Sequence, residues 1–156
     1  MNWEQLKDFG IGLGFVGLQI VMFRHLELWG MQPDLVLIYL LWLITLRDRT
    51  TCILMAAGLG LVQDALLDLW GLNMFAKTLM TFAIYNYIPK SKETRLLIGQ
   101  IFLTVLIGAL FHNIIFLGLN IIVESYSAEL LFWRKWIGNA VYTTVVAGFI
   151  QLFRTN

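Results

Sequence analysis

Three ionisable residues lie in one of the most apolar parts of the chain. In the run LGLVQDALLDLWGLNMFAKTLMTF, residues 59–82, the charged side chains are Asp64, Asp68 and Lys77. A charge facing lipid at mid-membrane costs about 2.5–3.5 kcal/mol on an insertion scale. An acid and a base that face each other, or a wet cavity, avoid most of that cost. The chemistry that this pattern allows is therefore charge pairing inside a bundle, ligand binding or proton movement.

Helical spacing predicts that these residues share a polar seam. Asp64 lies seven residues before Gly71, where we expect a turn, and Lys77 lies six residues after it, so the two should sit at similar depth on antiparallel helices. The expected seam consists of Gly60, Gln63, Asp64 and Asp68 on one helix and Asn73, Lys77, Thr81 and Tyr85 on the next. We interpret it as hydrogen bonding between helices, with a ligand pocket, a proton path or a partner-binding face as alternatives.

Further polar residues are candidates for a cavity or a partner surface. Pro33 and Asp34 open the second apolar run, where the acid suits the positive end of a helix dipole or faces an external partner. His112 and Asn113 are interpreted as a hydrogen-bonded core pair, because a zinc site needs three or four ligands and the only other histidine is His25. The candidates for extending this polar interior are Asn113, Asn120, Glu124 and Asn139.

Small residues near the start of the chain indicate close helix packing. Gly10 and Gly14 form a G-x-x-x-G pair, with Gly17 nearby, which suits either an internal crossing or a partner's helix. Gly60, on the helix that carries Asp64, is a further candidate for helix packing. The single cysteine, Cys52, is interpreted as a packing residue. The residue pattern contains no catalytic set, no metal-ligand spacing and no phosphate-binding loop, so we expect neither enzymatic activity nor a cofactor.

Composition requires lipid as the solvent for these elements. The hydrophobic share is 59%, the charged share is 13% and the mean hydropathy is +0.76, whereas a soluble domain carries about 25% charge. The sequence has no stripe of Lys and Arg, so we do not expect nucleic-acid binding. We predict one all-α membrane domain, residues 1–156, with six spans at about 8–24, 33–47, 52–70, 72–88, 96–123 and 131–153.

The spans differ in length, and the loops differ in charge. The second offers about 15 residues and the fifth about 28, or roughly 22 Å and 42 Å of helix, so the fifth must tilt or project. Seven basic residues in short loops and tails fall on the side of the termini and three on the other, which predicts that both termini are cytoplasmic. The seven are Lys7, Arg47, Arg49, Lys90, Lys92, Arg95 and Arg154, and the three are Arg24, Arg134 and Lys135.

The arrangement resembles the MreD family of bacterial rod-shape proteins. The resemblance lies in a Pro-Asp-Leu at the start of the second span, in GLGLVQDALLDLWGL and in AKTL, all within residues 33–79. The sequence departs from the family where a Pro-Leu-Gly-like turn is replaced by WGLNMF. The resemblance implies a non-enzymatic, multi-pass protein of the inner membrane. Its expected partners are MreC, other proteins of the cell-elongation complex and anionic lipid.

The resemblance also implies a function and a fold. The family links cytoplasmic MreB filaments to peptidoglycan synthesis outside the membrane. It is similar to the substrate-binding component of energy-coupling-factor transporters, which implies a six-helix bundle with Asp34, Asp64, Asp68 and Lys77 lining an outward-facing cavity. The alternative is therefore a small-molecule-binding subunit like a vitamin-capture component, for which the fifth loop, 124–130, is the only candidate lid.

Overall fold

The computed structural model describes residues 3–23, 29–90, 98–124 and 129–154, except for the side chains of 22–23, 98, 123–124, 129–132 and 152–154. Within these ranges the chain is all-helical, with six α-helices and no strand. The α-helices are α1 (Trp3–Leu18), α2 (Leu35–Ile44), α3 (Arg49–Leu67), α4 (Leu72–Ile84), α5 (Ile98–Glu124) and α6 (Glu129–Arg154). A π-helix, η1 (Gln19–Phe23), continues α1, and a 3-10 turn, η2 (Tyr85–Tyr87), continues α4.

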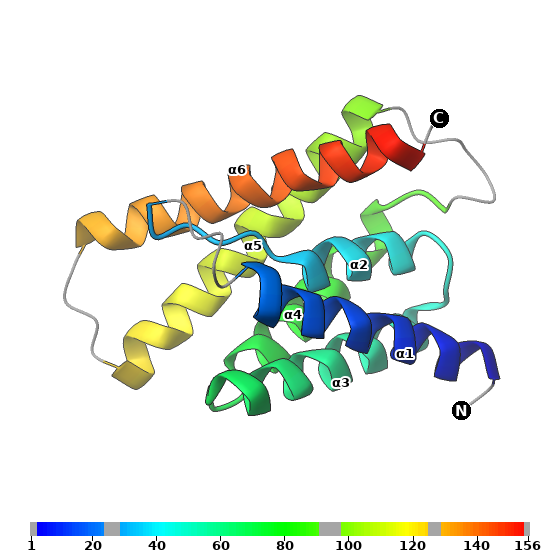
Figure 1. The fold of residues 1–156 in the computed structure, drawn as a ribbon, viewed down its shortest axis with the longest axis horizontal. Helices are drawn as coiled ribbons and strands as arrows, with labels where there is room; N and C mark the ends of the chain where they lie inside the picture. Colours follow the sequence, from blue (N-terminus) through cyan, green and yellow to red (C-terminus); the bar gives the residue numbers. More distant parts are fainter. Residues whose placement is uncertain (1–2, 24–28, 91–97, 125–128, 155–156) are drawn as a thin grey trace.

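The short helix α2 lies at the centre of the fold. It contacts each of the other five α-helices, and Figure 1 shows it between α6 on one side and α1 and α3 on the other. Eight of its ten residues are buried. Lipid tails are as apolar as leucine, so close packing and buried hydrogen bonds, more than the hydrophobic effect, decide where such a helix sits in a membrane.

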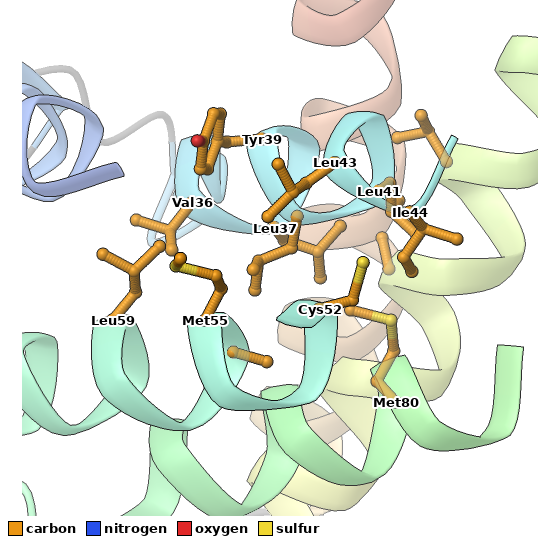
Figure 2. Packing of buried hydrophobic residues seen from close by; sticks show 14 of the residues in the cluster. Val36, Leu37, Tyr39, Leu41, Leu43, Ile44, Cys52, Met55, Leu59 and Met80 are labelled. Atoms are coloured by element: carbon orange, nitrogen blue, oxygen red, sulfur yellow. The ribbon is translucent and has the colours of Figure 1, made fainter. Parts of the chain in front are cut away.

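The core joins α2 to α3 and α4. Figure 2 shows Val36 and Leu37 of α2 facing Met55 and Leu59 of α3, with Met80 of α4 beside them. The core also includes residues of α5 and α6, and further contacts connect α2 to α1. Tyr39 donates its hydroxyl proton to the Asp8 carbonyl over 2.7 Å and stacks on Phe15. Gly12 supports this contact, because a Cβ there would lie 2.5 Å from a Leu59 methyl group.

The second predicted span, 33–47, differs most from the structure. As a helix it covers only ten residues, or about 15 Å, roughly half of a bilayer's hydrocarbon thickness. Asp34 causes the late start, since its backbone is extended and its carboxylate caps the Leu37 N–H. Pro33 therefore precedes the cap instead of occupying the first turn, and α2 is a buried strut preceded by extended chain.

Length and composition single out two membrane-crossing candidates among the described helices. They are Arg49–Leu67 in α3 and Gly99–Ile122 in α5. The 27 residues of α5 reach roughly 40 Å, which exceeds the hydrocarbon thickness as the sequence predicted. The other helices pack against these two, and the crossing of all six remains a prediction.

Candidate functional site

Lys77 is the most deeply buried charged residue among those described, and it forms the centre of a polar network. Its side chain is completely buried. The ammonium donates to Asp34 Oδ2 over 2.7 Å and to Asn73 Oδ1 over 3.0 Å. Asp34 is nearly buried too, with 14% of its side chain exposed. This ion pair joins α4 to the N-terminus of α2.

The extended segment before α2 is held by side chains from distant parts of the chain. The Gln32 N–H donates to Asn139 Oδ1, and the Asp34 N–H donates to Thr143 Oγ1, both over 3.0 Å and both on α6. The Val36 N–H donates to Gln19 Oε1 of η1 over 3.1 Å. We call residues 32–36 the anchored segment, because these side chains hold it in place. Because α1's end, α4 and α6 all contribute to it, its position depends on the whole bundle.

Asp64 has a different role from the one that the sequence predicted. It was expected to pair with Lys77, but its carboxylate accepts the backbone N–H groups of Asn73 and Met74 over 3.0 and 2.8 Å. It therefore caps α4 from the neighbouring helix, which satisfies donors that Gly71, the N-cap residue, cannot reach. Asp34, not Asp64, is the acid that pairs with Lys77.

Gly60 makes this capping possible. A Cβ at Gly60 would lie 2.6 Å from Met74 Cα and 2.8 Å from Met74 N, so α3 and α4 touch backbone to backbone. This close approach brings Asp64, one turn further along α3, to the first N–H groups of α4. The predicted helix-packing role of Gly60 thus has a specific neighbour.

Asp68 does not belong to the buried seam. The helix ends at Leu67, and Asp68 adopts left-handed backbone angles, φ 56° and ψ 40°, with its N–H donating to the Asp64 carbonyl. The i, i+8 spacing from Gly60 therefore no longer applies, and the carboxylate is exposed. The expectation that Asp64 and Asp68 share one stripe is wrong for this reason.

The remaining polar candidates form a second, looser group. His112 Nδ1 lies 3.3 Å from Asn113 Oδ1, which agrees with the interpretation of a core pair, and Asn113 donates to the Trp136 carbonyl. No hydrogen-bond partner is found among the described residues for the buried atoms Gln63 Oε1, Thr81 Oγ1, His112 Nε2 and Asn120 Oδ1. Glu124 ends α5, and its side chain is outside the described part.

The glycines of the predicted G-x-x-x-G face outward. A Cβ at Gly10, Gly14 or Gly17 would meet nothing within 4 Å, and all three residues are exposed. The glycine that packs inside is Gly12, which the motif did not include. Of the two readings that the sequence left open, an internal crossing is therefore excluded for the described residues.

At the opposite end of α2, Arg47 forms a clasp that joins α1 to η2 and to Lys90, which follows η2. Its guanidinium pairs with Glu4 and Asp8 of α1. Its carbonyl accepts from the Tyr85 hydroxyl over 3.1 Å and from Lys90 Nζ over 3.3 Å. Arg47 and Lys90, two of the basic residues counted on the side of the termini, thus bind other groups of the protein.

A pocket of about 380 Å³ opens at the Asp68 end of the bundle. It lies between η1, the start of the anchored segment and the last turn of α3. Its lining consists of Gln19, Ile20, Gln32, Pro33, Leu66, Leu67 and Asp68. Sequence reasoning named two of these residues, Pro33 and Asp68, but did not predict the pocket. The other five, Gln19, Ile20, Gln32, Leu66 and Leu67, carry no signal that separates them from lipid-facing residues. Among the described residues no group of three His, Cys, Asp or Glu side chains could hold a metal ion.

Comparison with known families decides the classification. The model of the family described as rod shape-determining protein MreD matches residues 9–155. The chain belongs to the MreD family. The match covers the anchored segment and the helices α3, α4, α5 and α6. No curated protein and no solved structure matches the chain.

Family membership gives the chain a role in rod-shape determination. MreD proteins are membrane proteins, which agrees with the two apolar helices that are long enough to cross a bilayer. The resemblance noted between residues 33 and 79 thus extends over almost the whole chain.

Proposed function

We propose that this MreD-family chain is a non-enzymatic scaffold of the cell-elongation machinery in the bacterial inner membrane. In this proposal it crosses the membrane six times with both termini in the cytoplasm. It binds MreC and thereby helps to couple MreB filaments to peptidoglycan synthesis. Other elongation proteins and anionic lipid are further partners. Family membership and the predicted charge bias of the loops support this assignment.

The observation that carries the proposal is the contrast between a buried charge that is paired inside the bundle and an open glycine face on α1. The strongest buried charges are neutralised inside the bundle, where Lys77 pairs with Asp34. The face of α1 at Gly10, Gly14 and Gly17 meets no other part of the described chain within 4 Å of an added Cβ. Glycine gains nothing from lipid contact, whereas it lets the backbone of a second helix approach closely. We therefore place the transmembrane helix of MreC on this face.

The internal network gives the scaffold its fixed shape. Four elements meet at the anchored segment through hydrogen bonds of 2.7–3.1 Å. A fixed surface can hold a partner in one conformation, and a few kcal/mol of differential binding suffices to shift a two-state equilibrium. The polar residues of the network act in this proposal by positioning α1 and α6, not by binding the partner themselves.

Co-purification with MreC tests the scaffold. Gly10→Leu combined with Gly14→Leu fills the open face without an internal clash, so the chain should fold as before but capture much less MreC. Gly118→Leu on α5 is the matched control, because a Cβ there also meets nothing within 4 Å. Unchanged capture by the double variant would contradict the placement on α1. No capture by the native chain would contradict the scaffold itself.

The pocket near Asp68 favours a second candidate function. Its volume of about 380 Å³ falls within the range of about 300–1,000 Å³ that is usual for small-molecule sites. A ligand-binding subunit similar to a vitamin-capture component would use such a pocket. A thermal shift of the purified chain with a panel of water-soluble vitamins tests it, and the absence of any shift would argue against this function.

A further inference from the structure

The pocket at the end of α3 combines one uncompensated acid with apolar walls. Asp68 is exposed and forms no ion pair or side-chain hydrogen bond with the rest of the described chain. Leu66, Leu67, Ile20 and Pro33 supply apolar surface around it. Arg134, a base on α6, already donates to the Trp29 carbonyl over 2.6 Å. Asp68 and these apolar walls are therefore complementary to a positive charge attached to an apolar body.

Long basic side chains have this combination of properties. Lysine and arginine carry a flexible apolar stem with the charge at its tip. Their stem fits against leucine, isoleucine and proline, and their tip reaches a carboxylate. The amide groups of Gln19 and Gln32 lie in the same wall, and Gln19 is held in place by its bond from the Val36 N–H. An anionic headgroup would meet Asp68 as a like charge, which excludes it as the favoured occupant.

The position of the pocket identifies the source of the basic side chain. α1 passes into η1 without a break, so Ile20 in the pocket wall lies six residues, or about 9 Å, beyond Gly14. Ile20 follows Gly17 by three residues, and its side chain packs against the core, so the pocket lies just past the end of the open glycine face, on the bundle side of the helix. A helix packed along that face arrives beside the pocket about two turns after it leaves Gly14. A basic side chain of the polypeptide that packs on α1 can therefore reach the pocket.

We propose that this pocket receives a lysine or arginine side chain of the partner polypeptide, at the end of the helix that packs on α1. The inference rests on the scaffold function proposed above and adds a chemical specificity to it. Gly10, Gly14 and Gly17 provide contact without charge recognition, whereas Asp68 fixes how far the partner helix slides along α1.

Photo-crosslinking tests the occupant directly. The crosslinking residue p-benzoylphenylalanine replaces Leu66 at the pocket rim in the full chain, expressed together with MreC. Replacement of Leu61, which is exposed one to two turns earlier on α3, is the matched control. We expect crosslinks from position 66 to a segment of MreC that contains Lys or Arg, and few from position 61. Mass spectrometry of the product identifies the segment.

Asp68→Asn then tests the charge. Asparagine keeps the size of the side chain and tolerates left-handed backbone angles, so folding should be unaffected. We expect the variant to bind MreC about three- to tenfold more weakly, and to lose part of the salt dependence of binding. Changing the crosslinked base of MreC to Gln should cost the native chain a similar factor and the variant almost nothing.

The outcomes separate this inference from the scaffold proposal. If MreC co-purifies but position 66 crosslinks to lipid or to an uncharged segment, the scaffold stands and the basic occupant is wrong. Binding of MreC that is insensitive to Asp68→Asn and to salt overturns the inference as well. If MreC does not bind the native chain at all, the scaffold proposal fails first.

Discussion

At the scale of single residues, the buried Lys77 has one acid partner, and that partner is Asp34. The pair lies between α4 and the first turn of α2, with Asn73 as a second acceptor. Asp34 has two further bonds, since one carboxylate oxygen caps Leu37 and the backbone N–H reaches Thr143. Removal of Lys77 thus leaves a carboxylate with a cap but without a counter-charge.

Lys77→Met should lower the stability of the chain by about 3 kcal/mol, because breaking a buried pair leaves an uncompensated charge. Adding Asp34→Asn, which removes that charge and keeps a capping oxygen, should restore most of the loss. Thermal unfolding in detergent, followed by tryptophan fluorescence, measures both variants.

The matched control replaces the acid that the sequence had favoured. Asp64→Asn in the Lys77→Met background should add a further loss, since Asp64 caps α4 and does not contact Lys77. Recovery with Asp64→Asn instead of Asp34→Asn would show that the pairing described above is wrong.

Asp64 makes its own prediction at the start of α4. Asp64→Ala removes the acceptor of two backbone N–H groups and should destabilise the chain by about 1–2 kcal/mol. Hydrogen exchange followed by mass spectrometry should show faster exchange in the peptide containing Asn73 and Met74, and little change in α5. Exchange that rises equally in all helices would instead indicate general unfolding and contradict a local capping role.

At the scale of elements, glycines in the same sequence have opposite roles. Gly60 permits backbone contact between α3 and α4, whereas Gly10 faces open space. Both are helical, and both belong to small-residue patterns that a reader of the sequence treats alike. Only the neighbouring helix distinguishes them, which is why the packing partner of each glycine could not be predicted.

Paired alanine substitutions measure this difference. Gly60→Ala forces a methyl group against the Met74 backbone, which cannot yield as a side chain can, and should cost about 1–3 kcal/mol. Gly10→Ala has room and should leave stability unchanged or raise it by up to about 1 kcal/mol through helix propensity. Gly58→Ala, which meets the movable Phe9 ring at 3.0 Å, should lie between the two. Thermal unfolding in one detergent ranks all three, and an equal loss at positions 10 and 60 would contradict the assigned packing.

The elements themselves were largely predictable, because hydropathy reports which residues avoid water. Helical residues 3–23, 49–67 and 98–124 match apolar runs expected at 8–24, 52–70 and 96–123. Hydropathy does not report whether an apolar helix faces lipid or protein, so the buried α2 resembled a span. Asp34 was a visible signal for the start of α2, because aspartate is a common N-cap residue. The extended segment before it, however, depends on Asn139 and Thr143, more than a hundred residues away.

The candidate site was predictable in composition but not in its pairing. Depth along the chain placed Asp64 level with Lys77, and that argument holds only if two helices face each other with those residues between them. The Gly60 contact instead brings Asp64 to the backbone of α4, and the interior position falls to Asp34 on a third helix. In the sequence, Asp34 looked like a residue that caps the next helix, and nothing indicated that it would also pair with Lys77.

At the scale of the whole molecule, five α-helices of unequal length surround the ten-residue central helix α2. The charged interior lies toward one end of α2, and the Arg47 clasp lies at the other. If the chain crosses the membrane as proposed, the pocket and Asp68 face the periplasm while Arg47 and Lys90 face the cytoplasm. The bundle then presents its acid to the outside and its bases to the anionic inner leaflet.

Cysteine labelling in intact cells tests this orientation. Cys52 is buried and is replaced first by alanine, which gives a chain without cysteine. A cysteine introduced at Trp70, which is 90% exposed, should then react with a membrane-impermeant maleimide added outside the inner membrane. A cysteine at Tyr87, also exposed, should react only after the membrane is opened. Trp70 lies two residues before α4, and Tyr87 is the last residue of η2, which continues α4. Opposite labelling of the two cysteines would therefore demonstrate one crossing and its direction. The reverse pattern would place the pocket in the cytoplasm, where MreC's periplasmic part could not reach it.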